Sequence, residues 1–187
     1  KAFNPDIQIN DSIGIKLETN ELGRIAAQTA KQIITQKVRD AEREIIFGEF
    51  EQRKGEIASG IARRVERGAI VVDLGRTEAH IPLREQIPGE IYKPGDRIQG
   101  YISDVRQTTR GPQIIMSRSS EQYLIKLFEI EVPEIYDGIV QVMAAAREPG
   151  QRAKIAVTSK DSAVDPVGAC VGMKGSRVQN IVQELKG

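Results

Sequence analysis

The sequence is poor in the residues that build most catalytic and metal sites. Its 187 residues include one cysteine, one histidine and no tryptophan, and aromatic residues make up 4% of the chain. A lone cysteine, Cys170, excludes an internal disulfide and a zinc site made of cysteine pairs. We expect it to be a small buried core residue. With His80 as the only histidine, we predict no catalytic residues, no metal site, no cofactor and no enzymatic activity.

Long hydrophobic runs are also absent. No stretch of about 18 apolar residues occurs, and the N-terminus lacks the basic, apolar and small-residue order of a signal peptide. We therefore expect a cytoplasmic protein with no membrane partner. The chain begins with Lys1 and its last residues follow a helical pattern, so we expect a fragment of a longer protein.

The sequence has no large excess of positive or negative charge. It contains 27 basic and 26 acidic residues, which give a formal net charge of +1. This balance argues against a uniformly basic nucleic-acid-binding surface. Basic and acidic residues number 9 and 9 in residues 1–54, 10 and 8 in 55–119, 1 and 5 in 120–146, and 7 and 4 in 147–187. Two mildly basic segments are thus separated by an acidic one, a pattern that points to local nucleic-acid contacts.

Residues 1–54 are predicted to carry two short strands and one long helix. Polar and apolar residues alternate in 6–10 and 13–18, with the period of a strand. From Asn20 onward apolar residues recur every three or four positions, with Thr19 or Asn20 as the cap. A helix from Glu21 to Lys54 would measure about 51 Å, long enough to act as a strut between two modules.

Residues 55–119 are predicted to form an all-β domain. Alternation begins at Ile57, and turns follow at Gly68 and at Pro94-Gly95. Five short strands in about 65 residues fit a small closed antiparallel barrel. The expected strands lie at 56–67, 69–74, 79–83, 98–104 and 114–117.

Residues 120–187 are predicted to mix helices and strands. A linker helix at 120–137 precedes a hairpin of 139–143 and 154–157, whose connection contains Pro149 and Gly150. A short apolar helix and a second helix then flank residues 172–175, Gly-Met-Lys-Gly. Glycines also end ordinary helices, but GxxG with a basic residue inside, between two helices, is typical of the nucleotide clamp of a KH domain.

The chemistry of this loop suits a phosphate backbone. Two glycines let the protein backbone approach sugar and phosphate without a Cβ in the way. The free amides and the dipole of the following helix favour an anion. We predict an RNA-binding loop made of Gly172, Met173, Lys174, Gly175, Ser176 and Arg177.

The strand region resembles a known family of RNA-binding barrels. Residues 55–85, then KPGDRIQGYISDV (93–105) and QIIMSRS (113–119), resemble an S1 domain, which is an OB-fold. The resemblance implies single-strand binding across the second and third strands and two neighbouring loops. Few aromatic residues are available there, so we expect weak binding led by charge, and His80 is also consistent with an ordinary exposed strand residue. The candidates are Arg64, Arg67, Arg76, His80, Arg84, Tyr101 and Arg110.

The order of these segments resembles the NusA family of bacterial transcription elongation factors. The strings IEVPEIYDG (130–138), AAAREPGQRAKIAV (144–157) and VDPVGACVGMKGSRVQNIVQEL (164–185) carry the resemblance. It implies a multidomain α+β chain with a partial, long-helix N-terminal domain that binds RNA polymerase (1–54). An S1 barrel (55–119) and a linker helix with an incomplete α/β KH domain (120–187) follow.

The same resemblance implies a non-enzymatic RNA-binding factor. Its partners would be RNA polymerase, nascent single-stranded RNA and other elongation and antitermination factors, and it would regulate pausing, termination and antitermination. A cap subunit of an RNA-degrading exosome-like complex is the alternative, since it also carries S1 before KH, but the long helix and the string VDPVGACVGMKG disfavour it. A piece of a polynucleotide phosphorylase would carry KH before S1, the opposite order.

Overall fold

The computed structural model describes residues 23–109 and 111–186. By their contacts the residues divide into two units, 1–40 and 41–187, and helix α1 (Arg24–Gln52) contributes to both. The strands predicted before this helix, and the caps Thr19 and Asn20, lie outside the described residues. No helix in the described part of the chain is long and apolar enough to cross a membrane.

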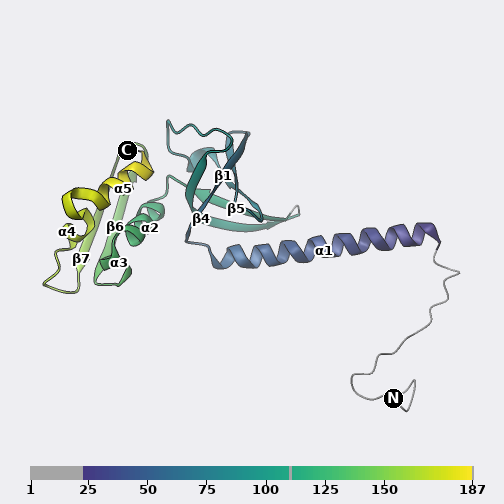
Figure 1. The fold of residues 1–187 in the computed structure, drawn as a ribbon, viewed down its shortest axis with the longest axis horizontal. Coiled ribbons are helices and arrows are strands. Elements are labelled where there is room, and N and C mark those ends of the chain that lie inside the picture. The colour runs from purple at the N-terminus through teal and green to yellow at the C-terminus, as the bar shows by residue number, and fades with distance from the viewer. Residues whose placement is uncertain (1–22, 110, 187) are drawn as a thin grey trace, which may run out of the picture. The chain divides into compact units, whose positions relative to one another are not determined.

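Helix α1 is continuous over 29 residues, about 44 Å at the usual helical rise (Figure 1). It ends two residues earlier than predicted, because the chain turns at residues 53–55 and Gly55 has a φ of +95°. In the first unit its apolar side chains Ile33, Ile34 and Val38 are exposed. In the second unit Phe50 is 2% exposed and belongs to the barrel core.

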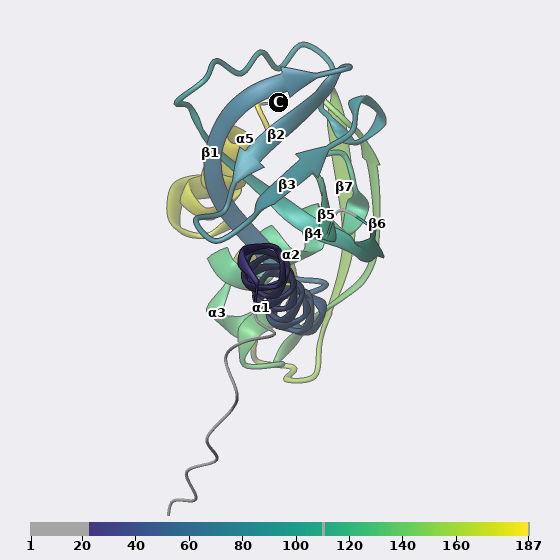
Figure 2. The ribbon, with the colours of Figure 1, turned by 90° about the vertical axis from the view of Figure 1, so that its right-hand side faces the viewer.

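Five strands form the predicted barrel (Figures 1 and 2). They are β1 (Ile57–Glu66), β2 (Ala69–Asp73), β3 (Glu78–Ile81), β4 (Arg97–Thr108) and β5 (Gly111–Ser117), closed in the order β1-β2-β3-β5-β4. The prediction of a purely antiparallel barrel is wrong at one seam, because β3 and β5 pair in parallel. The short 3-10 turn η2 (Leu83–Glu85) follows β3.

The alternating sequence explains the barrel core. Ile98, Ile102, Ile114 and Met116 are each at most 1% exposed and point inward from β4 and β5. Where two strands approach closely, only glycine fits: a Cβ on Gly60 would collide with backbone and side-chain atoms of the neighbouring strand.

The remainder of the second unit combines helices with a hairpin. Its elements are α2 (Glu121–Glu131), α3 (Pro133–Tyr136), β6 (Val140–Glu148), β7 (Arg152–Ser159), α4 (Pro166–Val171), the 3-10 turn η3 (Met173–Gly175) and α5 (Ser176–Leu185). Both hairpin strands are longer than predicted, so only residues 149–151 connect them. The predicted fold class, a multidomain α+β chain, is confirmed.

A second core holds these helices against the hairpin. Tyr123 and Phe128 of α2 pack with Ile181 of α5 in a cluster of buried side chains. Cys170 belongs to this cluster and is 5% exposed, and burial raises the pKa of its thiol. The cysteine is therefore a core residue, as predicted, and is poorly suited to act as a nucleophile.

Arg118 joins the barrel to the helices. It follows β5 and is 1% exposed, and its guanidinium donates to both carboxylate oxygens of Glu90 at 2.7 and 2.8 Å. The same group donates to the Gln99 carbonyl oxygen in β4 and to the side chain and carbonyl oxygen of Glu184 in α5. Because a buried cation must be paired to be tolerated, this network fixes α5 next to the barrel.

Candidate nucleic-acid interface

The barrel carries a cavity of about 620 Å³ that is lined by residues of β1, β3, β4 and β5 and of the neighbouring turns. Two of the predicted residues, Arg64 and His80, line it. Arg64 lies opposite Val71 across β1 and β2, and Val71 in turn lies opposite His80 across β2 and β3. The other lining residues are Thr77, Glu78, Thr108, Thr109, Gly111, Pro112 and Gln113.

The positive charge in this cavity is already paired. Arg64 makes two hydrogen bonds to the Glu78 carboxylate, at 2.7 and 2.9 Å, and a third to Glu66. The pairing lowers the pKa of Glu78 and raises that of Arg64. Arg64 can therefore contact a phosphate only by giving up or sharing an existing partner.

His80 supplies the least satisfied polar group of the cavity. Its Nδ1 atom is buried and has no hydrogen-bond partner in the part of the chain that the structure describes. Buried polar atoms are normally hydrogen-bonded, so a movement of the imidazole that exposed this nitrogen would let it bond to a ligand in the cavity. An imidazole can both stack on a base and hydrogen-bond its edge.

The other predicted barrel residues lie away from the cavity lining. Arg67 occupies the β1–β2 turn with a φ of +50°, and Arg76 pairs with Glu49 of α1 at 2.9 Å. Arg84 lies in η2 and its side chain is 78% exposed. Tyr101 is partly buried against the core of the helical part. Arg110 lies outside the described residues, between the lining residues Thr109 and Gly111 in sequence.

Sequence reasoning missed Glu78. Strand periodicity could have found it, since Glu78 and His80 are two positions apart on β3 and share a face. The polar lining residues next to the β4–β5 turn, Thr108 at the end of β4 and Gln113 near the start of β5, carry no sequence signal that separates them from an ordinary hairpin.

The GxxG loop has the geometry that only glycine adopts readily. Gly172 and Gly175 have φ values of +73° and +79°. A Cβ on Gly172 would lie 2.7 Å from Cγ of Arg177, so any larger residue would displace that side chain. Between the glycines, Met173 is 89% exposed, and Lys174 is exposed with a φ of +52°.

Helix α5 begins at this loop without a side-chain cap. Its N-cap residue is Gly175, which has no side chain to accept from the first amides. The first turn contains no acidic residue either. An anion at this helix end would meet backbone amides and the positive end of the helix dipole.

Arg177 has a structural partner. Its guanidinium donates to the Glu134 carboxylate at 2.8 Å and to the Ala169 carbonyl oxygen at 2.6 Å. These bonds tie the start of α5 to α3 and α4. Lys174 forms no ion pair within 23–109 and 111–186, so its charge is available to a ligand at the loop. A cavity of about 550 Å³ is lined in part by Gly172, Met173 and Ser176, its neighbours in sequence.

Comparisons with known proteins agree with this arrangement. Three family models match in succession: the NusA N-terminal domain over residues 1–44, the S1 RNA binding domain over 51–117 and the NusA-like first KH domain over 118–187. The chain belongs to the NusA family. The NusA resemblance seen in the sequence is thereby confirmed over nearly its full length.

NusA proteins from several bacteria align with the whole chain. Each of the following is named transcription termination/antitermination protein NusA. The protein from Halalkalibacterium halodurans is 54% identical over 187 residues, which are 100% of this chain and 49% of the relative. The Bacillus subtilis protein is 52% identical, covering 100% and 50%, and the Thermus thermophilus protein 44% identical, covering 98% and 48%. The chain thus spans about half the length of these curated relatives.

Proposed function

We propose that this chain is the part of a NusA-type transcription factor that holds nascent single-stranded RNA close to RNA polymerase. In this role it regulates pausing, termination and antitermination without catalysing a reaction, and it works in the cytoplasm together with other elongation and antitermination factors. The proposal rests chiefly on the GxxG loop, where two glycines with positive φ, a lysine with no ion pair among the described residues and an uncapped helix start come together. The names of the relatives support the role in transcription.

The proposed division of labour follows the domains, at 1–54, 55–119 and 120–187. The N-terminal part anchors the chain to polymerase, and the exposed apolar side chains Ile33, Ile34 and Val38 on α1 are suited to a protein contact. The GxxG loop holds the RNA backbone through amides and Lys174. The barrel cavity receives a neighbouring nucleotide, with His80 against the base.

Weak sites suffice for such a factor. A chain tethered to polymerase experiences the nascent RNA at a high effective concentration, so each contact needs little affinity by itself. This accounts for the small net charge of +1 and the low aromatic content. Neither would support tight binding to free RNA.

A charge-reversing substitution in the loop tests the RNA assignment. Gly175→Asp should weaken binding of a single-stranded oligoribonucleotide at least about tenfold, or about 1.4 kcal/mol, because a carboxylate would repel the phosphate. Gly138→Asp is the matched control: Gly138 has a φ of +73° and a Cβ there would have no atom within 4 Å, while Gly175 has a φ of +79° and a Cβ there would have its nearest atom at 3.8 Å. Filter binding that shows equal affinity for the two variants would contradict the assignment.

The polymerase contact needs a separate measurement. A photo-crosslinking residue placed at Ile34 or Val38 should label RNA polymerase in a stalled elongation complex, while one at the exposed Lys160 in the hairpin region should not. Equal labelling from both regions would argue against anchoring through α1.

A further inference from the structure

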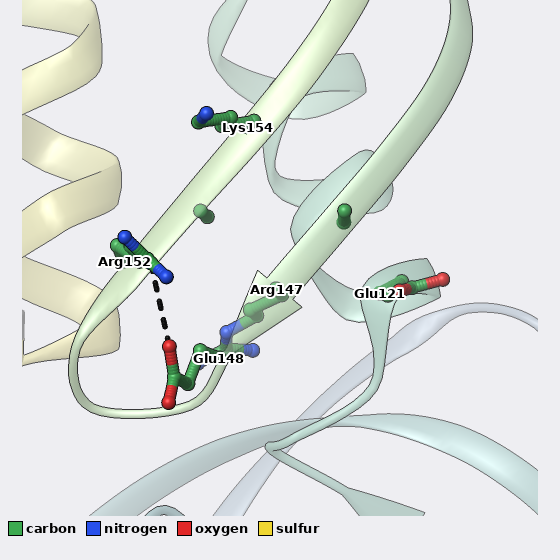
Figure 3. A pocket seen from close by; sticks show the side chains of 7 residues that line it. Glu121, Arg147, Glu148, Arg152 and Lys154 are labelled. Carbon is green, nitrogen blue, oxygen red and sulfur yellow. Dashed lines mark ion pairs between the residues drawn. The ribbon is translucent and has the colours of Figure 1, made fainter.

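A cavity of about 360 Å³ lies at the β6–β7 hairpin, apart from the barrel cavity and the GxxG loop. Figure 3 shows Arg152 and Lys154 extending from β7 and Arg147 near the end of β6. Glu121 lies at the start of α2. Three of the seven lining residues are basic and two are acidic. The lining residues are Glu121, Ala146, Arg147, Glu148, Arg152, Ala153 and Lys154.

Arg147 brings an uncompensated positive charge to this cavity. One of its terminal nitrogens donates to the Arg118 carbonyl oxygen at 2.6 Å, and the other is buried with no hydrogen-bond partner among the described residues. Within 23–109 and 111–186 no carboxylate forms an ion pair with it. Burial lowers the pKa of Arg147, and the neighbouring Arg118 adds to the effect, so a nearby anion would stabilise its charged form.

The two exposed cations are only partly balanced. Arg152 pairs with Glu148 at 3.3 Å, and their side chains are 78% and 52% exposed, so the pair is open to solvent and easily exchanged. Lys154 forms no ion pair among the residues described. It lies two positions from Arg152 on β7, and therefore on the same face of the hairpin.

The hairpin is held in place at its tip. A Cβ on Gly150 would lie 3.2 Å from the Ile87 side chain and 3.3 Å from the Pro88 carbonyl oxygen, so the tip packs against the barrel's β3–β4 connection. The hydrogen bond from Arg147 to Arg118 ties the end of β6 to the segment that follows β5. The basic side chains are thus presented from a fixed position.

We propose that Arg147, Arg152 and Lys154 form a third RNA contact that binds a backbone phosphodiester group. This contact deepens the proposed RNA-binding function and depends on it. Arg152 gives up its ion pair with Glu148 and binds the phosphate, and Lys154 adds a second direct charge. Arg147 contributes its positive charge at longer range, without a direct contact.

Nucleic acid fits this cavity better than an acidic protein does. Protein interfaces depend on large aromatic or aliphatic side chains that fill pockets. The uncharged lining residues here are only Ala146 and Ala153. A lining of small residues and cations leaves charge as the dominant attraction, which is how proteins recognise a phosphate backbone without sequence preference.

The test compares two double variants with the same change in net charge. Arg152→Gln with Lys154→Gln should lower the affinity for a single-stranded oligoribonucleotide about tenfold at about 0.1 M salt. It should also reduce the slope of log affinity against log salt by about 1, since each phosphate contact contributes about 0.7 for single strands and Arg152 begins paired. Lys126→Gln with Lys160→Gln, which lie outside all three sites, should change the slope little.

Glu148→Gln should change the RNA affinity in the opposite direction. Freeing Arg152 should raise RNA affinity about twofold. The substituted side chains are exposed, so thermal unfolding should be nearly unchanged, and a large drop would reveal a folding defect that the Glu148 variant avoids.

The outcomes separate this inference from the wider proposal. If the unsubstituted chain fails to bind the oligoribonucleotide, the proposed function itself fails. If it binds, and the two double variants have equal affinities and salt slopes, only the phosphate contact is overturned. Loss of binding to an acidic peptide, with RNA binding unchanged, would overturn it in favour of a protein partner.

Discussion

The barrel cavity and the GxxG loop present positive charge in different ways. In the barrel the charge belongs to side chains that are already paired, as Arg64 is with Glu78. In the loop it belongs to backbone amides at the start of α5 and to Lys174, which has no partner among the residues described. A phosphate at the barrel must compete with a carboxylate, whereas the first turn of α5 at the loop contains no acidic residue. The number of basic residues in a region is therefore a poor measure of how much unpaired positive charge it offers to an anion.

Removing Arg118, which links the barrel to the helical part that carries the GxxG loop, should have the largest effect on stability. Arg118→Met would leave the Glu90 carboxylate, whose side chain is 3% exposed, buried without its partner. We expect the free energy of unfolding to fall by about 3 kcal/mol, measured by denaturant titration. Arg64→Met, which breaks an exposed pair, is the control and should change stability little. Equal losses would show that the buried network does not hold the two regions together.

Removing the free lysine of the loop should cost more affinity than removing a paired arginine of the barrel. Lys174→Gln should weaken RNA binding about fivefold at about 0.1 M salt and reduce the salt slope by about 0.7. Arg64→Gln should change both less, because Arg64 is neutralised before RNA arrives. Fluorescence anisotropy over a salt series measures both values. A larger loss for Arg64→Gln would reverse the comparison.

Removing the carboxylate that makes two hydrogen bonds to Arg64 should leave the barrel with a less fully paired cation, closer to Lys174 in the loop. Glu78→Gln removes the main partner of Arg64 and a negative charge from the cavity, so RNA affinity should rise about threefold. Asp73→Asn serves as the control, because it makes the same change in net charge. Asp73 pairs with Arg63, and neither residue lines the cavity. An equal rise in both variants would mean that only net charge matters.

Acid should weaken the barrel through its paired carboxylates. Hydrogen bonds from Lys54 and Arg106 lower the pKa of Asp104 to about 2. Because the folded pKa lies below the unfolded one, the pair stabilises the fold above about pH 4, and this contribution is lost as the pH falls towards about 2. Asp104→Asn should therefore show a slightly smaller drop in unfolding temperature over this range. An identical drop in both proteins would exclude a contribution from Asp104.

Much of the fold could be predicted from sequence periodicity. Alternation located all five barrel strands and the hairpin, although the hairpin strands proved longer. The parallel pairing of β3 with β5 could not be predicted, because it results from closing the barrel between strands that are distant in sequence. Assignment of the site was less complete: Arg64 and His80 line the cavity, while Arg76 is paired with α1 and Tyr101 packs on the helical core.

The sequence alone determined the order of the modules, the periods of their strands and helices, and the glycine loop before α5. These features depend on residues a few positions apart, which the chain itself places together. The tertiary structure decided which charges are available. Arg64 meets a carboxylate 14 positions away and Arg118 meets one 66 positions away. Coulomb interactions depend on distance in space, and only the folded chain sets that distance.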